Sequence, residues 1–146
     1  MRIKLALALL ITLAMGAERV AAETPNKAEL AAGYAAHLVN LVNQYRQRHH
    51  LPQLLLDDRL IRLAQEHAVD MANQRRLSHD GFDGRFKRAN RELCVENVGW
   101  NYRNAEEQLK GWRNSPGHNV NLLNAEVRRV GIAIVQGYVS YFACTA

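Results

Sequence analysis

The chain has 146 residues, 48% hydrophobic and 23% charged, which is the composition of an ordinary globular protein with one modest core. Its formal charge is +5, but the arginines are scattered among acidic residues and asparagines. A nucleic-acid-binding protein would show a clustered basic stripe, so we do not expect nucleic acid as a partner. No internal repeat or low-complexity tract divides the chain, and we expect a single domain.

The N-terminal segment has the pattern of a secretory signal peptide. Basic residues precede an unbroken apolar run from Leu5 to Met15, and small residues surround a cleavage point after Ala22. This predicts a signal peptide over residues 1–22 and a mature domain over 23–146. The apolar run is shorter than the about 20 residues of a membrane-spanning helix, and no cysteine follows it that could carry a lipid. We therefore expect a secreted or periplasmic protein with no stable membrane anchor after cleavage.

The first half of the mature chain is predicted to be mainly helical. A cap at Asn26 with a glutamate three residues later, followed by apolar residues at helical spacing, predicts a helix to about residue 48. A second amphipathic helix begins at residue 57 or 58 and runs to about 76. The segment 77–90 contains two glycines and little periodicity. We expect a loop there, or a loop with one turn of helix.

The second half combines short helices with strands. Valines and aromatic residues predict a strand over 94–102, and Asn104 caps a third helix. The Ser-Pro pair at 115–116 opens a short fourth helix. Two final strands are joined by Gln136 and Gly137, which predicts a tight antiparallel hairpin. Helices that come first and strands that come late indicate the α+β class rather than a βαβ repeat.

The mature chain has two cysteines, Cys94 and Cys144. In an exported protein an even number of cysteines predicts a disulfide. Closing a loop of this length would stabilise the fold by about 4 kcal/mol on the chain-entropy model. A catalytic thiol is the alternative, which the absence of an adjacent base disfavours.

Three polar residues are candidates for a site. His118 lies just inside the start of the fourth helix, where the helix dipole disfavours the protonated imidazole and leaves a lone pair for base or metal chemistry. His79 lies in the predicted loop, and Glu96 lies between the valines of the predicted strand. Two histidines and a carboxylate fit a zinc site with a position left open for water.

The other histidines and two serines are weaker candidates. His49 and His50 stand at the polar end of a helix and are expected to face solvent. His67, at the border of an apolar helix face, is expected to be a hydrogen-bonded core residue or a support for the site. Ser115 is a possible nucleophile, but a serine at a helix cap normally binds backbone N–H groups. Ser78 is poorer still, because it directly precedes the candidate histidine.

Three stretches together resemble a known family: "LVNQYRQRHHLPQLLLDDRLIRLAQEHAVDMANQRRLSHDG", "ENVGW" and "GWRNSPGHNVNLLNAEVRRVGIAI". In this order they resemble the CAP superfamily of cysteine-rich secretory proteins, antigen 5 and pathogenesis-related proteins (SCP domain), in its compact bacterial form. The resemblance covers about residues 36–144. It implies an α-β-α sandwich with a small antiparallel sheet and an open cleft, which in some members binds zinc or another divalent ion.

The resemblance places the family's cleft residues at His79, Glu96 and His118. A second cleft glutamate of the eukaryotic members has no counterpart, and Ser115 stands at the nearest position. Any metal would therefore rest on the two histidines and water, with Glu96 as their partner or orienter.

Three functions follow as hypotheses. We favour a secreted binding module that engages a small apolar ligand, a cell-wall component or a partner protein. The alternative is a metal-dependent, peptidase-like hydrolase in which His79 and His118 hold the ion and Glu96 is the general base. The third is a purely structural role for the histidines, so whether the protein is an enzyme stays open. Four aromatic residues are candidates for a ligand groove or for the core: Phe82, Phe86, Trp100 and Trp112.

Overall fold

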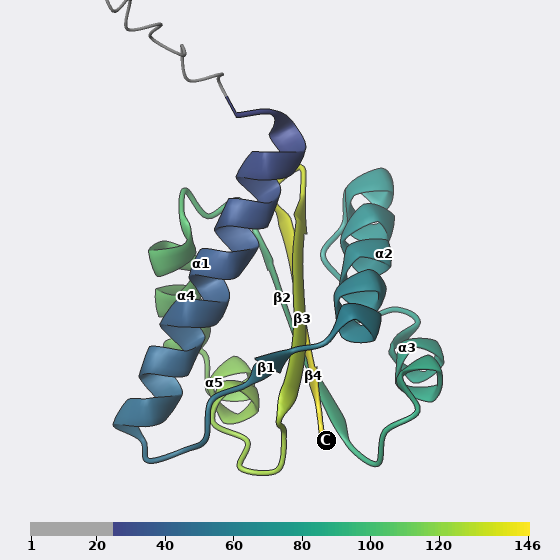
Figure 1. Ribbon diagram of the computed structural model, residues 1–146. Coiled ribbons are helices and arrows are strands. Elements are labelled where there is room, and N and C mark those ends of the chain that lie inside the picture. The colour runs from purple at the N-terminus through teal and green to yellow at the C-terminus, as the bar shows by residue number, and fades with distance from the viewer. Residues whose placement is uncertain (1–24) are drawn as a thin grey trace, which may run out of the picture.

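The computed structural model describes residues 25–146, so the predicted signal peptide lies outside the described residues. The elements in chain order are α1 (Lys27–Arg48), β1 (Leu55–Leu56), α2 (Asp58–Gln74), α3 (Phe82–Ala89), β2 (Cys94–Trp100), α4 (Ala105–Arg113), α5 (Pro116–Leu122), β3 (Arg129–Val135) and β4 (Tyr138–Cys144). Helices α1, α4 and α5 cover one face of the sheet, and α2 and α3 cover the other (Figure 1). The predicted α+β class and sandwich are confirmed.

The sheet has the strand order β1-β3-β4-β2. Strands β3, β4 and β2 are antiparallel neighbours, while the two-residue β1 adds to β3 in parallel. Gln136 and Gly137 have φ values of 49° and 83°, as the two-residue turn of a tight hairpin requires. The hairpin prediction is therefore confirmed. Strand β1 was not predicted, because two residues are too few to show the alternation of apolar and polar side chains that marks a strand.

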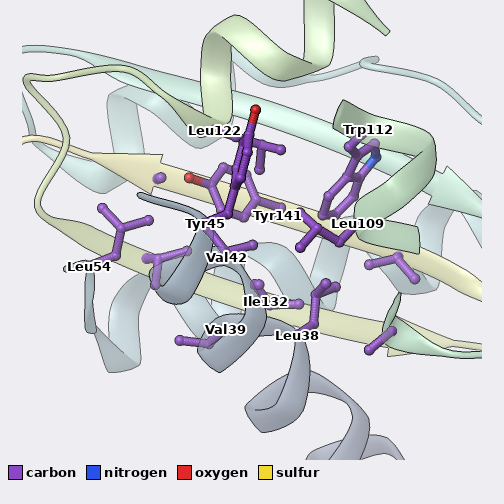
Figure 2. Packing of buried hydrophobic residues seen from close by; sticks show 14 of the residues in the cluster. Leu38, Val39, Val42, Tyr45, Leu54, Leu109, Trp112, Leu122, Ile132 and Tyr141 are labelled. Carbon is purple, nitrogen blue, oxygen red and sulfur yellow. The ribbon is translucent and has the colours of Figure 1, made fainter. Parts of the chain in front are cut away.

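Each face of the sheet has its own hydrophobic core. Trp112 and Tyr141 pack edge to face between the sheet and the α1, α4 and α5 layer, as Figure 2 shows in close-up. On the other face, α2 packs directly on β3 at Gly131. A Cβ atom there would lie 2.1 Å from the backbone carbon of Leu60, so only glycine permits this close approach.

A buried arginine joins the end of α1 to the end of α5. The Arg46 guanidinium is fully buried and donates to the carbonyls of Pro52, Leu122 and Asn124, at 3.0, 2.8 and 2.9 Å. Burial lowers its pKa below the ordinary value of arginine. These bonds satisfy carbonyls that the helix end leaves free, and they fix α5, the helix that carries His118.

The expectation for residues 77–90 is only partly correct, because α3 forms two turns within them. Its inward face consists of Phe82, Arg85 and Ala89, at the spacing of a helix. An amphipathic helix is recognised by apolar residues on its inward face, and here one of those positions holds an arginine. The helical spacing of apolar residues is therefore incomplete in this segment.

The predicted disulfide is formed. Cys94 and Cys144 are bonded and lie opposite each other on β2 and β4. Both cysteines pack against the core between the sheet and α2, so the bond closes the end of the sheet next to the last residues of the chain.

Candidate functional site

The first candidate site is a charged cluster around Glu96 on β2. The Glu96 side chain is 1% exposed. Arg85 of α3 holds both of its oxygens, with Nε 2.7 Å from Oε2 and Nη2 2.8 Å from Oε1. A buried carboxylate with a two-point guanidinium partner is a strong, fixed ion pair.

Two histidines complete this cluster. His79 is 53% exposed, and its Nδ1 lies 2.9 Å from Oε1 of Glu96. His67 of α2 is buried and donates from Nε2 to the Ser78 carbonyl at 2.8 Å, while the same nitrogen lies 3.6 Å from Glu96. His67 therefore holds the loop that carries His79, which agrees with the predicted supporting role.

The charges of the cluster follow from burial and hydrogen bonds. Burial raises the pKa of Glu96, but hydrogen bonds from His79 and Arg85 outweigh it and hold that pKa below its ordinary value. Burial lowers the pKa of His67, with the Arg85 charge acting in the same direction and Glu96 opposing it. The cluster is thus an ionised Glu96–Arg85 pair beside a neutral His67.

The third predicted residue, His118, lies on α5 at the outer edge of β2. Asn97 of β2 donates to the His118 carbonyl at 3.0 Å, and Asn121 donates to the carbonyl of Glu96 at 3.0 Å. Burial, and then the charge of His79, lowers the pKa of the His118 imidazole. A neutral imidazole agrees with the prediction, and burial is the largest cause of the lowered pKa.

The geometry suits Glu96 as the residue that orients His79. Its hydrogen bond to Nδ1 leaves Nε2 as the open nitrogen of His79, as in carboxylate–histidine pairs of metal and catalytic sites. Within residues 25–146 no group of three or more His, Cys, Asp or Glu side chains is placed to hold a metal ion. A divalent ion would have His79 and His118 as its protein ligands, and this role stays a prediction, as does Glu96 as a general base.

The remaining candidates take other places. The Ser115 side chain makes no capping hydrogen bond in the part of the chain that the structure describes, so the argument that its hydroxyl is occupied by the helix start is wrong. Trp112 belongs to the core, and Trp100 is 52% exposed and stacks on Tyr138. His49 and His50 are exposed, as predicted.

Sequence reasoning missed Arg85, the residue that holds Glu96. Its one available signal is the spacing of Phe82, Arg85 and Ala89, which places the arginine on the inward face of a helix. Within "GRFKRANR" it is one of several basic residues, and the sequence alone does not separate it from its exposed neighbour Arg88.

The second candidate site is an apolar groove of about 480 Å³ at the opposite edge of the sheet. It runs along β3 between α1 and α2, and its lining includes Ala31, Ala35, Val39, Leu56, Ile61 and Ile132. A shallower hollow continues it to the first turn of α1, where Lys27 and Leu30 lie. Figure 1 shows α1 and α2 on either side of β3. The groove and the Glu96 cluster are therefore separate sites.

Comparison with known proteins agrees with this architecture. The model of the cysteine-rich secretory protein family (CAP) matches residues 39–145, which include every residue of the Glu96 cluster. The chain belongs to the cysteine-rich secretory protein family. The CAP domain is also similar to an extracellular protein with an SCP domain from Bacillus anthracis, with a TM-score of 0.78 and 26% identity over 85% of this chain and 45% of that chain.

Two further relatives limit how much can be concluded about function. An outer surface protein of Borrelia burgdorferi has a TM-score of 0.67 and 21% identity, over 76% of this chain and 92% of that chain, which shows the fold alone. The uncharacterized protein YkwD of Bacillus subtilis is 27% identical over 72% of this chain and 44% of its own length. The chain thus spans less than half the length of this curated relative.

Among the described residues, no helix has the length and apolar character needed to span a membrane.

Proposed function

We propose that this CAP domain is an exported, non-catalytic binding module whose groove along β3 takes an apolar ligand. The observation that carries the proposal is the groove itself, about 480 Å³ in volume and lined almost entirely by alanine and aliphatic side chains. Sites for small molecules are concave and mostly apolar, with few polar groups. The extracellular Bacillus anthracis protein with an SCP domain, to which this chain is similar, supports export.

The Glu96 cluster supports a non-catalytic role. Glu96 accepts hydrogen bonds from Arg85 at both oxygens and from His79 at one, and the adjacent guanidinium charge disfavours its protonation. Its lowered pKa also makes it a weaker base than a free carboxylate. In this proposal the cluster holds the loop that carries His79, and a divalent ion would rest on His79 and His118.

The hydrolase remains the second candidate because of one observation. The exposed His79 imidazole has a buried carboxylate on Nδ1, which is how an imidazole is oriented to act as a base at Nε2. If this is the function, Glu96→Gln removes peptide hydrolysis while the groove still binds its ligand.

The test uses residues 23–146 and a fluorescent long-chain fatty acid as the apolar probe. Ala35→Leu fills the groove, and Gln44→Leu adds the same side chain on an exposed turn of α1 outside it. We expect saturable binding that Ala35→Leu weakens at least about tenfold, a loss of about 1.4 kcal/mol, while Gln44→Leu and Glu96→Gln leave it unchanged. Equal binding by the Ala35→Leu variant would overturn the proposal.

A further inference from the structure

The outer edge of β3 is only partly paired. The Leu55 N–H donates to the Arg128 carbonyl at 2.9 Å, and the Asp57 N–H donates to the Val130 carbonyl at 3.0 Å. Even-numbered residues of this strand therefore direct their backbone groups toward β1, and odd-numbered residues direct theirs toward β4. Pairing with β1 ends at Val130.

Ile132 and Ile134 continue this outer edge beyond the end of β1. Within residues 25–146 no backbone or side-chain hydrogen bond to the N–H or carbonyl groups of these two residues occurs on that side. Both residues line the groove, and Ile132 is only 4% exposed. Ile134 is partly buried. Backbone groups away from solvent are nearly always paired in folded proteins, so this row of donors and acceptors is a place where a further strand can pair.

The walls of the groove suit an extended chain. An added strand would lie about 4.8 Å from β3, with side chains pointing alternately toward α1 and toward α2. On the α1 side it would meet Ala31 and Ala35, and on the α2 side Ile61. Apart from Gln65 of α2, both walls are apolar, so the strand would be mainly apolar on both faces, like a buried strand of a parallel sheet.

Other occupants fit these observations less well. A second folded copy has the same edge recessed between its own α1 and α2, so two such edges cannot meet. An acyl chain fills the apolar volume but leaves the backbone groups of Ile132 and Ile134 unpaired. A peptide backbone satisfies both the apolar walls and the hydrogen-bonding edge, and it extends an interface that β1 already forms on the same edge.

We propose that the groove binds an extended apolar segment of a partner protein, which adds to the sheet beside Ile132 and Ile134 in continuation of β1. The inference rests on the proposed function and names the class of its ligand. Residues 131–135 span about 17 Å, which corresponds to about five residues of partner strand. The segment is uncharged, rich in alanine and β-branched residues, and free of proline where it faces β3.

The experiment compares two peptides and a fatty acid on residues 23–146. The first peptide is acetyl-Val-Ala-Val-Ala-Val-amide, and the second is the same sequence with every amide N-methylated, which removes the N–H donors. On the protein, Ile134→Pro removes the outward N–H, and Ile134→Val is the control that keeps it. We expect the first peptide to bind and N-methylation to weaken its binding at least about tenfold. Ile134→Pro should weaken the same peptide at least about tenfold relative to Ile134→Val.

Amide hydrogen exchange in the wild-type protein tests the same inference without any substitution that could affect folding. The first peptide should slow exchange at Ile132 and Ile134 and leave Ala133 unchanged. If the fatty acid binds in the groove but the two peptides bind equally or not at all, the inference fails and the proposed function stands. If neither ligand binds, both fail.

Discussion

The two outer edges of the sheet differ in how their backbone groups are satisfied. On the β2 edge, the carbonyls of Glu96 and Val98 accept hydrogen bonds from Asn121 of α5 and Trp112 of α4, at 3.0 and 2.9 Å. On the β3 edge, only the first two residues are paired, by β1. Side chains from the helices that follow β2 therefore pair carbonyls along one edge. Along the described β3 edge, pairing with β1 ends at Val130.

The Glu96 cluster lies at the β2 edge and is a fixed site, whereas the groove along β3 is an adaptable site. Hydrogen bonds between β2 and α5 hold Glu96 and His118 in set positions, which suits a charged cluster that depends on short, directed bonds. An open strand edge invites pairing with other chains, and proteins usually protect it. Here α1 and α2 recess the edge, so that folded neighbours are excluded and a narrow ligand is admitted.

The largest expected effect is a loss of folding stability when the Glu96 cluster is broken. Arg85→Met removes the cation from a carboxylate that is 1% exposed, and breaking such a buried pair costs about 3–5 kcal/mol in the free energy of unfolding. Urea denaturation followed by circular dichroism measures it. The control is Arg88→Met on the same helix. Arg88 pairs with Glu66 but its side chain is 57% exposed, so this substitution should hardly change the urea midpoint. Equal midpoints for the two variants would show that Glu96 does not depend on Arg85.

A smaller effect compares neighbouring residues of β3. The Ala133 N–H faces β4, so Ala133→Pro leaves a buried carbonyl without its partner and should cost at least about 2 kcal/mol. The Ile134 N–H faces the open edge, so Ile134→Pro loses mainly side-chain packing, about 1 kcal/mol. Denaturation midpoints check this order. If Ile134→Pro were the more damaging substitution, the β3 edge would already be paired.

The elements with strong local signals were predictable from the sequence. Asn26 accepts from the backbone and Glu29 closes the capping box, and Asn104 caps α4 as its spacing indicates. The final hairpin follows from the two-residue connection between two strand patterns, and both connecting residues adopt positive φ. Strand β1 has only two residues and exists because β3 is available to pair with it, so no local pattern marks it.

The candidate site was predictable in part, for a physical reason. The resemblance brings His79 and Glu96 together, and the structure places them 2.9 Å apart. Arg85 was missed because burial of a charge depends on a partner 11 residues away, whereas sequence patterns report the apolar side of a helix. The open β3 edge was also beyond prediction, since it depends on where β1 stops.

Stability should fall with acid because of His67. Burial lowers the pKa of His67 in the folded state, so the unfolded chain takes up a proton first, near its ordinary value of about 6.5. The stabilisation is therefore complete above that pH and is lost as pH falls below it, at up to about 1.4 kcal/mol per pH unit for this group. Thermal unfolding between pH 8 and pH 5 should show a shallower slope for His67→Gln than for the exposed control His49→Gln. Equal slopes in the two variants would place the acid sensitivity elsewhere.

The smallest expected effect concerns zinc at the fixed site. His79 and His118 supply two nitrogens, fewer than the three protein ligands of most catalytic zinc sites, so residues 23–146 should bind zinc weakly and gain little in melting temperature. His79→Ala with His118→Ala should abolish this binding. Glu96→Gln should weaken it about tenfold, because the carboxylate orients the His79 ring. Titration calorimetry measures zinc binding by all three proteins. If the double variant still binds zinc, His79 and His118 are not the ligands, and the Glu96 cluster has a structural role.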